Sequence, residues 1–376
     1  MRGHIRKRGN SYSVVVYVGR DEATGKKKYK WYSGFKTKKE AEKALAELVN
    51  QIEKKEFVEE KKITLGEFIN EWFEIHCSKL TPKTKDSYAK MINAYILPYL
   101  ADIELANLKP LTIAKFYNAL KEKNISNTTL NYVHRLLREI YNFAVKWQYI
   151  SKSPFENVEA PKKDKKEMKV WTLEEVKKAE ILFKDTPIYL HVMLALYTGM
   201  RLGEVCGLKW DDIDFKNKLC AVRRVAENIK GGLVIKDKPK TDKSLRIITL
   251  TENLVELLKE EKLKQKENRL KAGPNYNSQY EGFISVWEDG RFKTPEYVSK
   301  KFGKILSRQN EIKKIRFHDL RHTHATLLLQ SGVNMKVISD RLGHSQISIT
   351  MDLYSHVNLD MQREAIEKLE QRLAKD

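Results

Sequence analysis

Six residues in the C-terminal half carry the side chains that chemistry on a phosphodiester requires. Two are arginines, one is a lysine, two are histidines and one is a tyrosine: Arg201, Lys240, His318, Arg321, His344 and Tyr354. A pair of arginines can clamp the non-bridging oxygens of a phosphate, where negative charge gathers during attack. A lysine and two imidazoles can move protons, and a phenol beside several cations becomes an accessible nucleophile. Such a site needs no metal ion and no cofactor.

Each residue alone has a more ordinary explanation. An arginine beside a helix break, such as Arg201, is usually structural, and a lysine at a hairpin tip, such as Lys240, is normally just solvated. Tyr354 alone is more often a half-buried surface phenol. His318 and His322 resemble half of a zinc site, but no glutamate follows the first histidine and no cysteine is near, so we predict no metal. Only the complete set indicates a reaction site.

Local patterns predict how these residues are held. Gly199 suits a helix C-terminus, which leaves Arg201 at a break between two helices. Glu204 lies three residues further on and shares the helical face of Arg201, so it can orient a neighbouring cation. His318 and Arg321 are one helical turn apart and face the same way. Lys240 has to be positioned by the strand-like sequences on either side of it.

Three runs in the C-terminal half are typical of strands. They span about 219–225, 233–235 and 245–250, and Lys240 falls in the turn that joins the last two. A lysine on such a turn belongs to an arm that can reach into a groove of a duplex. We therefore expect a small antiparallel sheet inside a mostly helical region.

The charge of the chain points to a nucleic-acid partner. Seventy-one Lys and Arg against fifty Asp and Glu give a formal net charge of +21 over 376 residues, with a pI near 9.5. A merely basic protein, or one that sits on anionic lipid, is the alternative. The sequence has no apolar run of about eighteen residues and no signal segment, so neither membrane insertion nor secretion is supported. Three separated cysteines indicate a reduced intracellular protein.

Basic residues are concentrated at the front, where residues 1–39 hold twelve Lys or Arg and two acids. Strand-like runs at 11–18 and 27–33 predict a small sheet, and a helix that begins with the capping box of Thr37 and Glu40 would cover one of its faces. The other face would remain open to a duplex, and we assign four residues to it: Lys28, Tyr29, Lys30 and Trp31. A solvated basic hairpin without a specific partner is the alternative.

The whole pattern predicts an α+β chain of several domains. A small N-terminal sheet with one helix occupies 1–58, and an all-helical region with a packing stripe of aromatic residues occupies 62–150. Residues 151–169 are proline- and lysine-rich and predict an interdomain linker. A mostly helical region with a small antiparallel sheet follows over 170–376.

The chain resembles the tyrosine recombinases, and within them the integrases of phages and conjugative transposons. Five segments carry the resemblance, in identity, order and approximate spacing: Thr198-Gly199-Met200-Arg201-Leu202-Gly203-Glu204, Pro239-Lys240-Thr241, His318-Asp319-Leu320-Arg321-His322, Leu342-Gly343-His344 and Tyr354-Ser355-His356. The catalytic match is specific, whereas the match of the front half rests on architecture. The resemblance implies an arm-type DNA-binding domain, a core-binding domain and a catalytic domain. A polar stretch over 259–281 departs from the family pattern as an insertion.

The resemblance also implies a role for each residue. Tyr354 would attack the scissile phosphate and form a 3′-phosphotyrosine, and Arg201 and Arg321 would bind the non-bridging oxygens. Lys240 would protonate the departing 5′-oxygen and His318 would act as the general base toward the tyrosine. His344 would donate a hydrogen bond to the phosphate. Glu204 would support the catalytic residues without touching the phosphate itself.

The implied partners are double-stranded DNA at core and arm attachment sites and three further copies of the chain in a tetramer. The apolar residues Ile366, Leu369 and Leu373 form a stripe on a charged helix that can pack in cis or in trans. We favour trans, because control of cleavage at half of the sites needs coupling between copies. An excisionase and a host DNA-bending protein are further implied partners, in the cytoplasm of a bacterial cell. A type IB topoisomerase, with the same chemistry, and a catalytically silent DNA-binding protein are the alternatives.

Overall fold

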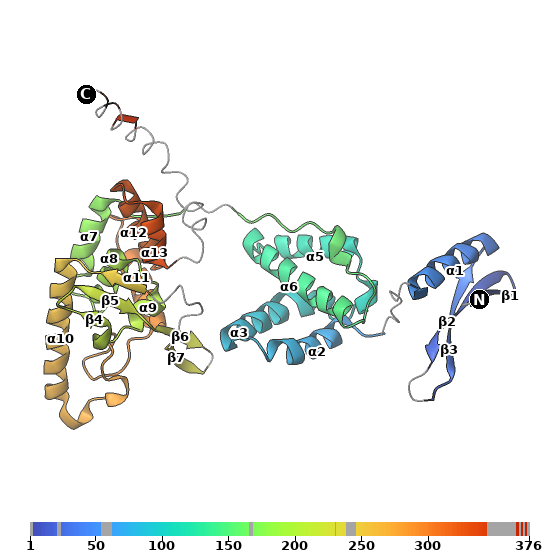
Figure 1. Ribbon diagram of the computed structural model, residues 1–376, viewed down its shortest axis with the longest axis horizontal. Helices are drawn as coiled ribbons and strands as arrows, with labels where there is room; N and C mark the ends of the chain where they lie inside the picture. The colour runs from blue at the N-terminus through green and yellow to red at the C-terminus, as the bar shows by residue number, and fades with distance from the viewer. Residues whose placement is uncertain are drawn as a thin grey trace. The chain divides into compact units, whose positions relative to one another are not determined.

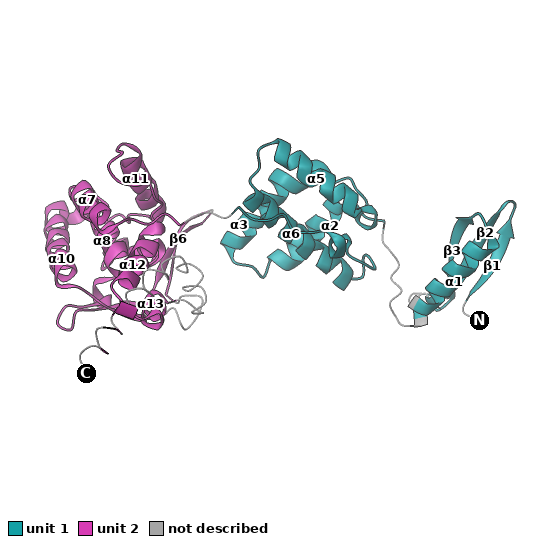
Figure 2. Cartoon of the chain, turned by 90° about the horizontal axis from the view of Figure 1, so that it is seen from above, with its two compact units in different colours: residues 1–165 teal, residues 166–376 magenta. Residues whose placement is uncertain are grey.

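The computed structural model describes residues 3–20, 24–53, 62–164, 168–229, 231–237 and 246–343, together with 366, 367, 370 and 373. The chain divides into two compact units, residues 1–165 and 166–376, which Figure 2 colours separately. Three of the predicted catalytic residues lie outside the described residues: Lys240, His344 and Tyr354. The same holds for Leu369 of the tail. In the part that is described, no helix is long and apolar enough to cross a membrane.

The front of the first unit is a three-stranded antiparallel sheet covered by one helix (Figure 1). The strands β1 (Gly3–Arg8), β2 (Ser11–Arg20) and β3 (Lys27–Phe35) pair in that order, and α1 (Lys38–Glu53) packs on the sheet. The backbone of Glu40 donates to the Thr37 side chain at 3.2 Å, so the predicted capping box is present. The first strand was not predicted, because five of its six residues are glycine or basic.

The rest of the first unit is helical, as predicted. Its α-helices are α2 (Leu65–Cys77), α3 (Pro82–Met91), α4 (Leu97–Leu100), α5 (Pro110–Glu122) and α6 (Asn127–Lys146), with a π-helical turn at Ile92–Ile96 before α4. Phe68 and Trp72 are fully buried among these helices, so the aromatic stripe serves packing. Thr64 is the N-cap residue of α2, and Pro82 is the first residue of α3.

The chain after α6 stays in contact with this helical core. Phe155 lies in a short 3-10 turn and is 2 % exposed in the core. Further on, Asn131 donates to the carbonyl of Pro161 at 2.8 Å and Asn127 to the carboxylate of Asp164 at 2.8 Å. The first part of the predicted linker therefore packs on the helices, since its few apolar and polar groups find partners there. The exact domain boundaries stay a prediction.

The second unit is mostly helical with two small antiparallel sheets, which confirms the predicted fold class. Its α-helices are α7 (Leu173–Phe183), α8 (Tyr189–Thr198), α9 (Leu202–Cys206), α10 (Glu252–Ala272), α11 (Pro295–Ser307), α12 (Asp319–Gln330) and α13 (Met335–Leu342). One sheet has the order β4 (Ile213–Asp214), β5 (Leu219–Val222), β8 (Arg246–Thr249). The other is the hairpin β6 (Val225–Ile229) and β7 (Gly232–Lys236). Helix α12 packs against α8 and α13.

The polar stretch predicted as an insertion over 259–281 is largely the second half of α10 followed by 3-10 turns (Figure 1). The first half of α10 buries Leu254, Val255 and Leu258 against the core of the unit. The second half is charged and leaves Leu270 83 % exposed. The stretch therefore continues a packed helix that begins after β8.

Gly199 ends α8 in the left-handed region, with φ +68°. A Cβ there would lie 2.6 Å from Leu342 and 2.7 Å from His324, on two other helices. The position therefore requires glycine for its backbone conformation and for the close approach of α12 and α13.

We expect Gly199→Ala to lower the free energy of unfolding of the second unit by about 2–6 kcal/mol, because the backbone strain and the overlap cost about 1–3 kcal/mol each and add. The measurement is thermal unfolding of the full chain by calorimetry. Gly303→Ala is the matched control: Gly303 lies in α11 with no atom within 4 Å of the added Cβ, so this change should leave stability unchanged or raise it. Equal effects of the two changes would contradict the assignment.

Candidate active site

Arg201 lies between α8 and α9, as predicted, in extended backbone that begins α9. Its side chain is 42 % exposed, and its Nη1 donates to Glu204 Oε1 at 3.1 Å. The backbone N–H of Arg201 donates to Glu204 Oε2 at 2.8 Å. The glutamate therefore fixes both the main chain and the side chain of Arg201, and part of the guanidinium remains accessible to a ligand.

Glu204 is 2 % exposed and is shared with a second arginine that the sequence reasoning missed. Arg246 at the start of β8 donates Nη1 to Glu204 Oε1 at 3.1 Å and Nη2 to Oε2 at 2.9 Å. Burial alone would raise the pKa of Glu204, but the hydrogen bonds and charges of Arg246 and Arg201 lower it. The carboxylate is therefore ionised and held by the two arginines together.

Arg321 lies in the first turn of α12 and is 2 % exposed. Its Nη1 donates to the carbonyl of Gly199 at 2.8 Å, and its Nη2 donates to the carbonyl of Leu342 at 2.7 Å. These bonds join the end of α8, the start of α12 and the end of α13 around one guanidinium. The sequence predicted that Arg321 faces a site, but not that it ties three helix ends together.

His318 precedes α12 on the exposed side of the helix start. Loss of part of its hydration, followed by the charge of Arg321 and a smaller effect of Arg201, lowers the pKa of His318 below 6.5. The bond from Arg321 to the Gly199 carbonyl holds the start of α12, where His318 lies, beside the break between α8 and α9 that carries Arg201. The structure thus brings together the three described members of the predicted set. At neutral pH the imidazole is uncharged and able to accept a proton.

The turn 316–319, which contains His318, is held by the ion pair between Arg316 and Asp319. Arg316 donates Nη2 to Asp319 Oδ1 at 2.7 Å and Nε to Oδ2 at 3.1 Å. The backbone N–H of Arg316 also donates to Asp319 Oδ2, at 2.8 Å.

The ring of His322 meets the ring of His318 edge-on, with the centroids 5.2 Å apart. Burial and the neighbouring His318 lower the pKa of His322 to about 4.

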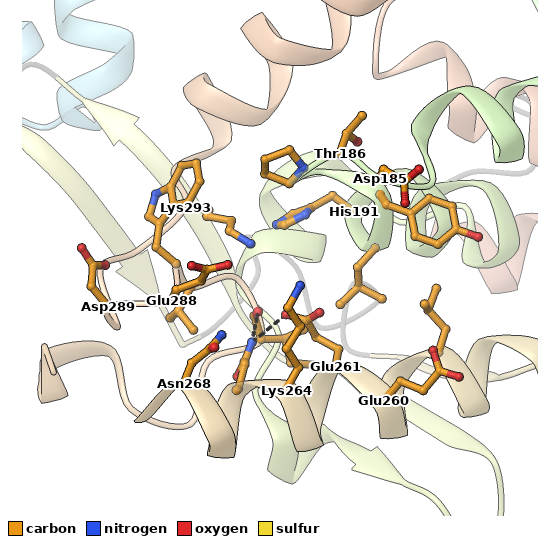
Figure 3. Close-up of a pocket in the computed structure, with 18 of the residues that line it drawn as sticks. Asp185, Thr186, His191, Glu260, Glu261, Lys264, Asn268, Glu288, Asp289 and Lys293 are labelled. Carbon is orange, nitrogen blue, oxygen red and sulfur yellow. Dashed lines mark hydrogen bonds between the residues drawn. The ribbon is translucent and has the colours of Figure 1, made fainter. Parts of the chain in front are cut away.

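A cavity of about 850 Å³ lies elsewhere in the second unit, between α10 and the segment 284–293 (Figure 3). Lysines and acids of both elements line it, and Figure 3 shows Lys264, Glu288 and Lys293 around its space. Neither Arg201, His318 nor Arg321 lines this cavity. This cavity therefore lies apart from the described residues of the predicted catalytic set.

In the front sheet, Trp31 and Tyr29 are 42 % and 50 % exposed, on the face away from α1. The guanidinium groups of Arg6 and Arg8 on β1 lie 5.3 Å and 5.2 Å from the Trp31 ring centroid. A hollow of about 580 Å³ on this face is lined by both aromatic residues, Arg6 and others. Strand alternation would have placed Arg6 and Arg8 together had β1 been predicted.

Lys28 and Lys30, which we assigned to this open face, alternate with Tyr29 and Trp31 along β3. Successive side chains of a strand point to opposite faces, so the two lysines point to the side that α1 covers. Lys30 accordingly lies over the ring of Tyr32, which packs with the core under α1, at 5.8 Å. The basic groups that line the hollow of the open face include Arg6 of β1 and Lys27, the first residue of β3.

Three segments of the chain match families of known proteins. Residues 173–361 match the phage integrase family, residues 4–52 an arm DNA-binding domain, and residues 64–121 the N-terminal SAM-like domain of phage integrases. A tyrosine recombinase XerC-like protein of Caldanaerobacter subterraneus subsp. tengcongensis is 33 % identical, with 97 % of each chain covered. The chain belongs to the phage integrase family.

This integrase is thus an enzyme of the tyrosine recombinase type, as its motifs predicted. The ICEBs1 integrase of Bacillus subtilis is 27 % identical over 96 % of this chain and 97 % of its own. A structure of the Tn1549 transposon integrase in complex with a circular intermediate DNA shares the fold, with a TM-score of 0.70, 22 % identity, and 82 % and 99 % of the two chains covered. A lambda integrase tetramer bound to a Holliday junction shares it with a TM-score of 0.59 and 19 % identity, covering 94 % of each chain.

We expect the histidines around α12 of the integrase to be neutral at pH 7. In a titration of ¹³C-labelled histidine followed by NMR, His322 and His324 should protonate near pH 4, and His318 below 6.5. Because these folded-state pKa values lie below the unfolded value, the unfolded chain binds more protons between about pH 4 and 6.5. The free energy of unfolding should fall as pH is lowered through that window.

The His322→Gln and His324→Gln variants assign the two resonances and serve as controls. A midpoint for His322 near 6.5 would contradict the arrangement, because it would mean that this ring is fully hydrated and remote from the site cations.

Proposed function

We propose that the chain integrates and excises a mobile DNA element by way of a 3′-phosphotyrosine intermediate and a Holliday junction. The observation that supports this proposal is the bond from Arg321 to the Gly199 carbonyl, which brings the start of α12, with His318 and Arg321, to the end of α8 beside Arg201. In the sequence, 117 residues separate Arg201 from His318. Such convergence of cations with a neutral imidazole suits a phosphate that is attacked by a hydroxyl group.

In the proposed reaction the Oη of Tyr354 forms a bond to the scissile phosphorus, and the bond from phosphorus to the 5′-oxygen breaks. The neutral imidazole of His318 accepts the phenol proton, and Lys240 gives a proton to the departing 5′-oxygen. Arg201 and Arg321 stabilise the charge on the non-bridging oxygens, with a hydrogen bond from His344. Religation is the reverse of these steps, so the bond energy is kept in the phosphotyrosine and no ATP is required.

The proposed partners are two DNA duplexes and three further copies of the chain. The lambda integrase structure is a tetramer on a Holliday junction, and by similarity we extend that assembly to this chain. Ile366 and Leu373 of the tail are 55 % and 69 % exposed, which supports docking of the tail on a neighbouring copy. An excisionase and a host DNA-bending protein would set the direction of the reaction.

The first test is formation of a covalent adduct. The protein is incubated with supercoiled plasmid in EDTA without ATP, the reaction is stopped with denaturant, and wild type is compared with Tyr354→Phe. We expect an adduct that survives denaturation in the wild type and is lost in the variant, because only the phenol oxygen can form the phosphotyrosine.

The products distinguish the alternatives. Relaxed plasmid without exchange of strands between two sites would favour a topoisomerase, and the absence of an adduct even on nicked duplexes would favour a DNA-binding protein without catalysis.

Removal of residues 360–376 in the same assay should leave DNA binding largely intact and reduce recombinant product, if the tail docks in trans.

We further propose that the open face of the front sheet binds arm-site DNA through Arg6, Arg8, Tyr29 and Trp31. Affinity falls as salt rises, and each phosphate contact that is lost makes the slope of log affinity against log salt less negative by about 0.9. Arg8→Gln should therefore make that slope less negative by about one unit, measured by fluorescence anisotropy on arm-site duplex. Lys38→Gln on α1, which pairs with Glu42 at 3.6 Å, is the control and should leave the slope unchanged. Equal slopes for wild type and Arg8→Gln would exclude this face.

A further inference from the structure

Arg246 is a buried cation that joins β8 to two other elements of the second unit, α9 and the end of α13. Its side chain is 6 % exposed and forms the two-pronged bond to Glu204 described above. Its Nε donates to the carbonyl of Arg341 at 2.7 Å, at the end of α13. A Cβ on Gly343 would lie 3.1 Å from Arg246 Cδ and 3.1 Å from its Nη1, so this turn packs directly on the arginine.

The two oxygens of Glu204 divide their bonds between Arg246 and Arg201. Oε1 accepts from the Nη1 atoms of both arginines, each at 3.1 Å. Oε2 accepts from Arg246 Nη2 at 2.9 Å and from the backbone N–H of Arg201 at 2.8 Å. A carboxylate that accepts a two-pronged arginine bond has its plane fixed, because the fork of the guanidinium is rigid. The position of Arg246 therefore sets the orientation in which Glu204 holds Arg201.

The exposures separate the roles of these two arginines. Arg201 is 42 % exposed and can meet a phosphate, whereas Arg246 is 6 % exposed. Without Arg246 the buried carboxylate would keep Arg201 as its cationic partner among the residues that the structure describes. A buried anion draws its remaining cation inward to compensate the lost hydration, which would take Arg201 away from the accessible side.

We propose that Arg246 is a positioning residue for the reaction: through Glu204 it directs the guanidinium of Arg201 toward the scissile phosphate. It also fixes the turn at Gly343, the residue before His344. This inference rests on the proposed function, because it requires that Arg201 acts on a phosphate. Arg246 itself does not touch the substrate.

The test compares two substrates in single-turnover adduct formation. One is a nicked duplex with an ordinary scissile phosphodiester, at the cleavage position mapped with the wild type. The other carries a methylphosphonate there, in which a methyl group replaces one charged oxygen. A neutral reacting group needs less stabilisation by cations, so a defect that acts through Arg201 shrinks on this substrate. A general loss of structure reduces both rates by the same factor.

We expect Arg246→Gln to slow cleavage of the phosphodiester about 100-fold, the effect of a misplacement of about 1 Å, and cleavage of the methylphosphonate less than about 10-fold. Arg246→Lys, which keeps the charge but not the fork, should lie between wild type and Arg246→Gln. The matched control is Arg224→Gln: Arg224 also joins two carboxylates, Asp212 at 2.6 Å and Asp237 at 3.1 Å, without contacting Glu204. Its two rates should change by one common factor.

Three outcomes would overturn the inference. Equal losses on the two substrates for Arg246→Gln, or for Arg246→Lys where the first variant does not fold, would show a merely structural role. Wild-type rates in Arg246→Gln would show no role. In both cases the wild-type adduct, absent in Tyr354→Phe, would leave the proposed function intact. A wild type that forms no adduct on either substrate would overturn the proposed function and this inference together.

Discussion

The buried carboxylate of Glu204 is the constraint on which the described site depends. Removing such a group from water costs several kcal/mol unless cations and hydrogen bonds compensate it. Here the start of α9 supplies Arg201 and the start of β8 supplies Arg246, so the helix and the strand must meet at this carboxylate. Because β8 also donates to the end of α13 through Arg246, the same constraint places the residues that lead into His344.

Burial together with the nearby arginines sets the protonation state of the histidines at this site. Burial, then the charge of Arg321 and more weakly that of Arg201, lowers the pKa of His318, and burial and Arg341 lower the pKa of His324 to about 4. Protonated imidazoles would add charge where cations are already concentrated. The arginines are therefore the groups that hold negative charge, and the imidazoles remain neutral groups that accept protons or, as in His324 beside the Leu196 carbonyl, fix one tautomer.

The sequence predicted those features whose partners lie within one helical turn. The capping box of Thr37 and Glu40 and the helix end at Gly199 are of this kind, because each contact spans three or four residues. The family was predictable because its motifs are short and appear in a fixed order.

Contacts between distant segments were not predictable in this way. Arg246 lies 42 residues from Glu204 and 95 from Arg341, and Arg321 lies 122 from Gly199. Nothing in the local sequence around Arg246 distinguishes it from the other basic residues on strands. The first strand was missed for a related reason: its alternation of Ile5 with His4 and Arg6 becomes informative only when β2 is known to pair with it.

The open face of the front sheet shows how a small domain can prepare basic groups for a polyanion. Three strands and one helix cover one face only, so Trp31 stays accessible. Two guanidinium groups lie over its ring, where the attraction between a cation and an aromatic face is worth about 0.5–1 kcal/mol at an exposed site. A planar guanidinium that rests on a ring keeps its N–H edge directed outward. Less side-chain freedom is then lost when a phosphate arrives, which a flexible lysine on the same strand would not achieve.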